Sequence, residues 1–193
     1  MKLDKSQTLT NLAKAYAGEC QARTRYEFIE YGARNQGYKA MAEIIDKIVY
    51  NEFNHARMFY TKMQDAGVNA LQSVEICGDF PFKEKWTLLD NLKFAAEDEE
   101  AEIKLYPKFA KVADEEGFPE IATLFRQIAQ IEKAHKKTFL TLYKQLSEKS
   151  LYQKPKPTEW KCSACGYTAT DKKAFDTCPV CMEKQGGVFL KLN

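Results

Sequence analysis

The two histidines of this chain occupy the same short frame, Glu52-x-x-His55 and Glu132-x-x-His135. Residues three positions apart lie on one face of an α-helix, so each frame aims a carboxylate and an imidazole at one point. Both groups bind divalent transition metals. Two such helices, with two more that supply glutamates, are typical of a di-metal site inside a four-helix bundle.

Three further glutamates interrupt apolar stripes of other helical segments: Glu19 in the first, and Glu99 and Glu102 in the third. Burying unpaired carboxylates costs several kcal/mol each, and two divalent cations would offset that cost. Carboxylates and imidazoles without a thiolate suit iron or manganese, with zinc able to substitute, and we favour iron. Asp98 is the main competitor of Glu99 and Glu102 for a place in the site.

Two tyrosines lie on the same stripes as these glutamates. Tyr26 is two turns beyond Glu19, and Tyr106 is one turn beyond Glu102. Residues around a metal site commonly hydrogen-bond the ligating carboxylates. Ordinary core packing explains either tyrosine equally well.

Four amphipathic helices are expected to position these residues. Apolar residues recur at three- and four-residue steps over about 4–34, 38–66, 86–116 and 119–147. Residues 67 to about 84 break this period and predict a long connection between the second and third helices. One such connection gives the ferritin-like arrangement of an all-α four-helix bundle.

Four of the six cysteines form two knuckles near the C-terminus, Cys162-x-x-Cys165 and Cys178-x-x-Cys181. Their thiolates can surround one ion tetrahedrally, and the spacing leaves both iron and a structural zinc ribbon open. The segment before them is rich in lysine and proline, which predicts a linker at 149–159. We therefore expect a helical domain at 1–148 and a metal-dependent domain at 160–193, since the latter is too short for a core of its own.

Charge and composition exclude several classes of function. The formal net charge is +2 and acidic and basic residues are interleaved, so we expect no nucleic-acid partner. The first ten residues lack the apolar run of a signal peptide, and no window approaches the ~20 apolar residues of a membrane span. We expect no membrane partner and a cytoplasmic location.

Taken together, the motifs resemble those of the rubrerythrin family. The resemblance covers essentially the whole chain and rests on residues 16–26, Glu52-Phe-Asn-His55, Tyr106-Pro107, residues 115–118, Glu132-Lys-Ala-His135, residues 160–167 and Cys178-Pro-Val-Cys181. It implies a ferritin-like four-helix bundle with one long crossover and a small C-terminal rubredoxin-like β/knuckle domain. It also implies a di-iron centre and one iron held by the four cysteines.

The resemblance assigns a role to each candidate residue. Glu52 and Glu132 would bridge the irons, and His135 would bind one of them. Glu19 and Glu99 would be terminal ligands, while His55 and Glu102 would alternate on the other iron. We count Tyr26 with the catalytic residues. The family is dimeric, so a homodimer is expected.

The activity implied by the resemblance is that of a peroxidase in oxidative-stress defence, reducing hydrogen peroxide to water. Electrons would come from NAD(P)H through an external donor, rubredoxin or a reductase, and pass through the four-cysteine iron centre. An alternative is a ferritin-like ferroxidase that handles iron, although it has little use for an attached redox centre. A second alternative is a zinc-loaded binding or structural protein.

One departure from the family pattern carries its own prediction. Between Glu102 and Tyr106 the chain is one residue shorter than usual, which rotates everything beyond by about 100° of helix. We therefore expect a π-bulge of the family to be absent and Tyr106 to miss the site.

Overall fold

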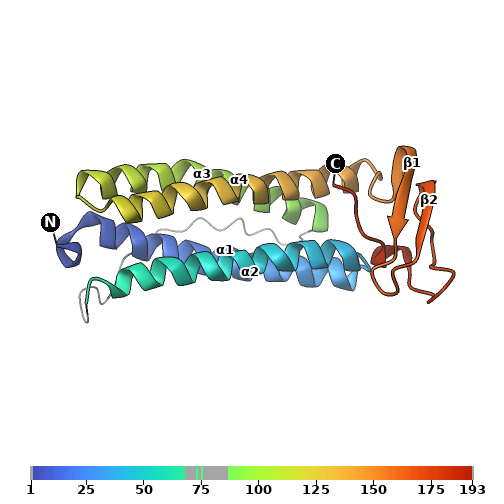
Figure 1. Cartoon of the computed structure of the whole chain (residues 1–193), viewed down its shortest axis with the longest axis horizontal. Helices are drawn as coiled ribbons and strands as arrows, with labels where there is room; N and C mark the ends of the chain where they lie inside the picture. The colour runs from blue at the N-terminus through green and yellow to red at the C-terminus, as the bar shows by residue number, and fades with distance from the viewer. Residues whose placement is uncertain (1, 68–72, 74, 76–86, 193) are drawn as a thin grey trace.

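The computed structural model describes residues 2–67, 73, 75 and 87–192. Its main body is a bundle of four long helices: α1 (Gln7–Asn35), α2 (Lys39–Gln64), α3 (Leu88–Glu115) and α4 (Pro119–Ser147), with a short 3-10 turn η1 (Leu3–Lys5) before α1. The helices form two antiparallel pairs, α1 with α2 and α3 with α4 (Figure 1).

Helices α2 and α3 run in the same direction, away from the end of the bundle that carries the β-strands (Figure 1). A chain that joins two parallel helices must return along the bundle, so this is the ferritin-like arrangement that the sequence predicts. The expected connection at 67–84 itself falls almost entirely outside the described residues.

The helix ends follow from local hydrogen bonding. The hydroxyl of Ser6 accepts the N–H of Leu9 at 3.1 Å and starts α1, three residues later than the apolar period predicts. Helix α3 ends where Gly117 adopts a φ of 87°, a conformation that favours glycine. Pro119 is then the first residue of α4, as predicted, because that position needs no N–H.

A layer of buried charged residues divides the bundle core into two apolar clusters. The cluster nearer the β-strands includes Tyr26, Ile45, Leu92 and Phe139. The cluster at the other end is made of Leu12, Ala15, Phe59, Tyr106, Ala110, Ala113, Ile121, Ala122, Phe125, Ile128 and Ala129. Each helix passes from one cluster to the other through the charged layer, so the layer is enclosed above and below by apolar side chains.

The C-terminal part is a small antiparallel sheet of β1 (Gln153–Lys161) and β2 (Thr168–Lys173), followed by a 3-10 turn η2 (Gln185–Gly187). Trp160 is fully buried against Ala174 and Val188, and its indole N–H donates to the Asp171 carbonyl at 3.0 Å. This core is small, as expected for a domain that depends on a metal. Residues 153–159 of the expected linker are part of β1; the domain boundary stays a prediction.

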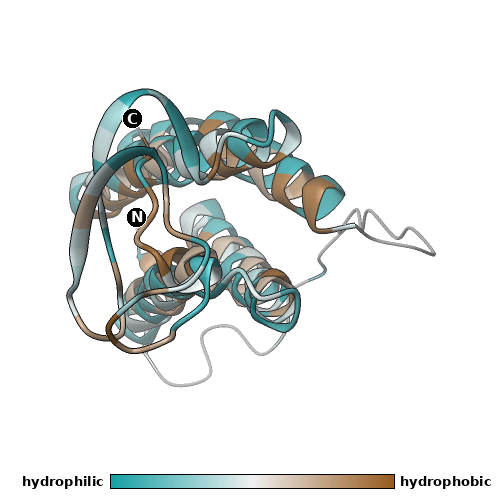
Figure 2. Cartoon of the chain, turned by 90° about the vertical axis from the view of Figure 1, so that its right-hand side faces the viewer, coloured by the Kyte–Doolittle hydropathy of each residue, from teal (hydrophilic) through white to brown (hydrophobic). Residues whose placement is uncertain are grey.

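The sheet and its loops pack across one end of the bundle (Figure 2). Lys39 of α2 forms a 3.2 Å ion pair with Glu183, and the Gln145 side chain of α4 donates to the Lys191 carbonyl at 2.8 Å. The backbones approach most closely at Gly186, where an added Cβ would lie 1.6 Å from the carbonyl oxygen of Gly37. Only glycine fits there.

No helix in the described part of the chain is long and apolar enough to cross a membrane.

Candidate metal centres

The charged layer of the bundle contains six of the seven candidate ligands predicted for the di-metal site. They form two groups whose ligand atoms lie within 4.8 Å of one another. One group is Glu19, Glu52, His55 and Glu132, and the other is Glu52, Glu99, Glu132 and His135. Because the groups share two glutamates, they describe a pair of neighbouring sites.

The two shared glutamates each divide their oxygens between the two histidines. Glu132 places Oε1 2.9 Å from Nδ1 of His55 and Oε2 2.7 Å from Nδ1 of His135. Glu52 does the same, with Oε2 3.2 Å from His55 Nδ1 and Oε1 2.9 Å from His135 Nδ1. A carboxylate with one oxygen at each position is suited to bridge two ions.

The remaining glutamates each belong to one position. Glu19 Oε2 lies 3.5 Å from Nδ1 of His55, and Glu99 Oε1 lies 3.7 Å from Nδ1 of His135. Each position therefore offers one histidine and one glutamate of its own besides the two shared carboxylates. The arrangement has approximate two-fold symmetry, with the imidazole rings 5.8 Å apart and inclined by 25°.

Among the described residues, these side chains have too few hydrogen-bond partners, and this observation tests whether they fit metal ions. All four glutamates are 0 % exposed. Within the part of the chain that the structure describes, no hydrogen bond reaches Glu19 Oε2, Glu52 Oε1 or either oxygen of Glu99 and Glu132, although several of them lie close to an imidazole nitrogen. One N–H cannot donate to three carboxylates, whereas a cation can accept lone pairs from all of them. The residues fit a pair of divalent cations.

The shifted pKa values of the buried glutamates and histidines also indicate a cation site. Burial raises the pKa of Glu19 and Glu99 well above the usual value for a carboxyl, and the neighbouring Glu52 adds to the effect. For His55, burial lowers the pKa, but the contacts with Glu132, Glu19 and Glu52 outweigh it and raise the pKa to about 12. Four carboxyl groups face two imidazoles, and divalent cations would favour the charged form of the carboxyls that burial alone disfavours.

Tyr106 reaches the site, contrary to the prediction drawn from the shorter segment before it. Helix α3 is α-helical throughout, without a π-bulge, as expected. The Tyr106 hydroxyl nevertheless donates to Glu19 Oε1 at 2.5 Å. Seven residues separate Tyr106 from Glu99, which is close to two turns, so a regular helix places both on the same face. Tyr106 thus orients a candidate ligand.

Three other predicted positions lie outside the two groups. A Cβ added to Gly18 would be 3.8 Å from Glu102 Oε1, so the Glu102 side chain lies against α1 beside the layer. The hydroxyl of Tyr26 makes a long 3.5 Å contact with the Ala95 carbonyl, and the ring packs in the apolar core. Asp98, the competitor, pairs instead with Arg25 at 3.0 Å.

Sequence reasoning missed Asn51. Its side-chain Nδ2 lies 3.1 Å from Nε2 of His135, the ring nitrogen opposite the one that faces the carboxylates. The only signal in the sequence is a difference between the two frames, because Asn51 precedes Glu52 whereas Ile131 precedes Glu132.

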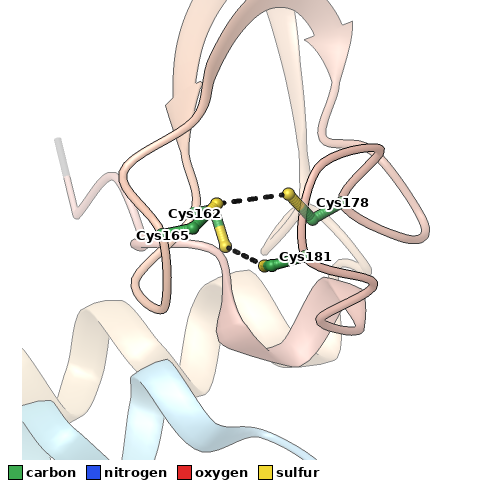
Figure 3. A group of neighbouring side chains, drawn as sticks. All are labelled: Cys162, Cys165, Cys178 and Cys181. Atoms are coloured by element: carbon green, nitrogen blue, oxygen red, sulfur yellow. Dashed lines mark hydrogen bonds between the residues drawn. The ribbon is translucent and has the colours of Figure 1, made fainter.

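The four C-terminal thiols form the second candidate centre, and the two knuckles face each other (Figure 3). Sγ of Cys162 lies 3.7 Å from Sγ of Cys181, and Sγ of Cys165 lies 3.6 Å from Sγ of Cys178. A tetrahedron with metal–sulfur bonds of about 2.3 Å has edges of about 3.8 Å, so the thiols already have the required spacing. Cys162 and Cys178 are buried, whereas Cys165 and Cys181 are exposed.

Backbone amides favour the thiolate form of one of the four cysteines, Cys178. For Cys178, burial raises the pKa, but the N–H groups of Cys181 and Val180 point at its sulfur and lower the pKa to about 7. A thiolate is the form that binds metal.

Comparison with known proteins agrees with both centres. The family model described as Rubrerythrin matches residues 10–143 and 90–161, and the model for the rubrerythrin rubredoxin-like domain matches residues 160–186. The chain belongs to the rubrerythrin family. The rubrerythrin of Clostridium perfringens is 42% identical over 93% of this chain and 92% of its own length. That of Porphyromonas gingivalis is 37% identical over 93% and 88%.

Solved structures show the same fold. Nigerythrin in a partially reduced state is 24% identical, with a TM-score of 0.63 over 95% of this chain and 86% of its own. The bacterioferritin of Desulfovibrio desulfuricans is also 24% identical, with a TM-score of 0.68 over 77% of this chain and 85% of its own. Family and geometry together make this chain a di-iron oxidoreductase, with a carboxylate and histidine di-iron site and a four-cysteine iron site.

Proposed function

We propose that this protein is a peroxidase that reduces hydrogen peroxide to water, with electrons passed from an external donor through the four-cysteine iron. The observation that carries the proposal is the presence in one chain of a buried two-position carboxylate site and a thiolate site with an exposed edge. An iron-storage protein needs the first and has no use for the second.

The ligand roles are part of the proposal. Glu52 and Glu132 would bridge the two irons, because each divides its oxygens between the two positions. Glu19 with His55 and Glu99 with His135 would complete the two positions. The proposed four ligands of the single iron are Cys162, Cys165, Cys178 and Cys181.

Held by the carboxylates and histidines, the iron pair would supply the two electrons that, with two protons, convert hydrogen peroxide into two waters, and the iron held by the four cysteines would pass electrons from the external donor one at a time. The protein side chains would bind the two irons and shield them from bulk water. The ligand glutamates are fully buried, and His55 and His135 are 2 % and 4 % exposed. Only a small molecule such as hydrogen peroxide or oxygen could reach them without opening the bundle.

Tyr106 and the aromatic residues packed against it fix the orientation of the Glu19 carboxylate. The Tyr106 hydroxyl donates to Glu19 Oε1 and so leaves Oε2, which faces His55, as the oxygen free to ligate. Phe59 and Phe125 pack against the Tyr106 ring, with ring centres 5.6 and 5.8 Å away, and fix its direction. These rings also separate the carboxylates from bulk water on that side.

The proposal also covers the oligomeric state, the location, the electron donor and the role of each domain. We propose a homodimer in the cytoplasm that draws on NAD(P)H through rubredoxin or a reductase and protects against oxidative stress. The helical part would act as the peroxide-reducing domain, 1–148. The thiolate domain, 160–193, would be the entry point for electrons, and the exposed edge formed by Cys165 and Cys181 supports this.

Steady-state assays distinguish the proposal from iron handling. Under anaerobic conditions the iron-loaded protein, with NADH, a rubredoxin and a rubredoxin reductase, should oxidise NADH only when hydrogen peroxide is added, with one NADH per peroxide. Glu52→Gln should abolish this turnover. Absence of peroxide-dependent NADH oxidation, together with oxygen-dependent oxidation of added ferrous iron, would instead assign the protein to the ferroxidases.

A further inference from the structure

Asn51 contacts His135, one of the two candidate ligand histidines, at the ring nitrogen that faces away from the carboxylates. It lies on α2, one residue before Glu52, and is exposed at the rim of the charged layer. Its Nδ2 is 3.1 Å from Nε2 of His135 on α4. The other ring nitrogen, Nδ1, faces Glu132 Oε2 at 2.7 Å and Glu52 Oε1 at 2.9 Å. The imidazole is thus placed between an amide and the carboxylates.

The direction of the ring dictates its protonation when it binds a metal. A neutral imidazole that ligates through Nδ1 must carry its proton on Nε2, and the hydrogen bond made by that second nitrogen sets the tautomer. The end of an asparagine side chain carries an N–H₂ donor and an oxygen acceptor, and a half-turn exchanges them. Asn51 can therefore present Oδ1 to an Nε2–H from its present position.

We propose that Asn51 is a positioning residue that accepts the Nε2–H of His135 and thereby fixes the tautomer and ring angle for ligation through Nδ1. The inference rests on the proposed role of His135 as a ligand and not on peroxide as the substrate. No part of it requires Asn51 to touch a metal ion or a substrate.

Asn51 positions only one of the two histidines, His135. The place before Glu132 in the second frame is taken by Ile131, which has no hydrogen-bonding side chain. Within residues 2–67, 73, 75 and 87–192, no hydrogen bond reaches Nε2 of His55; its contacts are all through Nδ1. Among the described residues, His135 is therefore the histidine with a side-chain partner at both ring nitrogens.

Because the chain contains two histidines, their ring signals can be observed and assigned separately by NMR. Protein labelled with ¹⁵N-histidine and loaded with zinc gives two sets of ring signals, which His55→Gln assigns. Wild type and Asn51→Asp, which retains an acceptor, should show His135 protonated at Nε2 with slow exchange of that proton. Asn51→Leu should show fast exchange. In a zinc titration, after the cysteine site is filled, one of the two remaining equivalents should bind at least about tenfold more weakly in Asn51→Leu.

Asn54→Leu is the matched control, because Asn54 lies on the same helix and its amide donates to the Tyr50 carbonyl. It should behave as wild type. Asn51 is exposed, so leucine there adds no volume to the core, and helical circular dichroism checks the fold. The proposal is overturned if Asn51→Leu keeps both the Nε2–H signal and both zinc affinities, if Asn51→Asp fails to preserve them, or if wild-type His135 is protonated at Nδ1 when loaded.

Discussion

Replacing Glu99 with leucine should stabilise the metal-free protein and destabilise the metal-loaded one. The carboxylate of Glu99 is 0 % exposed, and neither oxygen makes a hydrogen bond with any residue that the structure describes. A buried unsatisfied polar atom costs about 1–3 kcal/mol. Leucine removes both oxygens and leaves a small gap, so the net gain in the free energy of unfolding without metal is about 1–4 kcal/mol, as for other buried charges replaced by apolar residues.

With metal bound, we expect Glu99→Leu to lower the free energy of unfolding instead of raising it. A ligand present at 1,000 times its dissociation constant stabilises the folded state by about 4 kcal/mol. Among the residues that the structure describes, Glu99 is the only glutamate that belongs to the His135 position alone, so Glu99→Leu forfeits most of that gain there. The expected pattern is a higher urea midpoint than wild type in chelator and a lower one in excess ferrous iron, followed by helical circular dichroism under anaerobic conditions.

Glu97→Leu is the control for this experiment. Its side chain is 58% exposed on the same helix and its contact with Lys93 is a 3.8 Å surface ion pair. The change should move the free energy of unfolding by no more than about 0.5 kcal/mol in either condition. If Glu99→Leu destabilises the protein equally with and without metal, Glu99 is a structural residue and the reasoning fails.

Three further changes probe one contact at the start of α1, one between the C-terminal domain and the bundle, and one at the site. Glu116→Gln should lower the free energy of unfolding by about 1 kcal/mol at pH 7, because the carboxylate accepts the N–H and hydroxyl of Thr8 at 2.7 and 2.5 Å. Burial raises the pKa of Glu116, but these hydrogen bonds outweigh burial and lower it below the usual value for a glutamate. The stabilisation is therefore present at neutral pH and is lost as the pH falls through the lowered pKa, so the difference from wild type should shrink in acid; a difference in urea unfolding that does not change with acidification would refute this. Gly186→Ala should release the C-terminal domain from the bundle, since its Cβ would meet the Gly37 carbonyl, and an unchanged radius of gyration in solution scattering would contradict it. Tyr106→Phe should weaken one of the two metal equivalents about tenfold in a titration, and equal binding would show that its hydroxyl does not orient a ligand.

The helical spacing rules explain why the residues that the structure brings together in the charged layer could be recognised as candidate ligands in the sequence. A Glu-x-x-His frame must converge on one face, because the rise and twist of a helix are fixed. The same rules place Glu19 and Glu99 on apolar stripes, where a charge needs a partner. The four-helix arrangement with one long connection followed from the same periodicity.

Contacts that depend on how two helices are rotated against each other could not be predicted. The approach of Asn51 to His135 joins α2 and α4, and no spacing along one helix contains it. The close packing of Gly186 on Gly37 likewise depends on where the C-terminal domain docks. Tyr106 was predicted wrongly because the argument compared segment lengths with a family pattern. Its seven-residue separation from Glu99 already places both on one face.

The central claim is that electrons flow from the thiolate-bound iron to peroxide through the carboxylate site. The iron-loaded protein should be reduced anaerobically and mixed with two equivalents of hydrogen peroxide per di-iron site, because three ferrous ions hold three electrons and each peroxide takes two. The reaction is followed by stopped flow at the visible bands of the thiolate-bound iron. We expect rapid return of the oxidised bands, faster than with air-saturated buffer, and loss of this response in Glu52→Gln. Bands that stay reduced with peroxide, or that return equally fast in Glu52→Gln, would contradict the account.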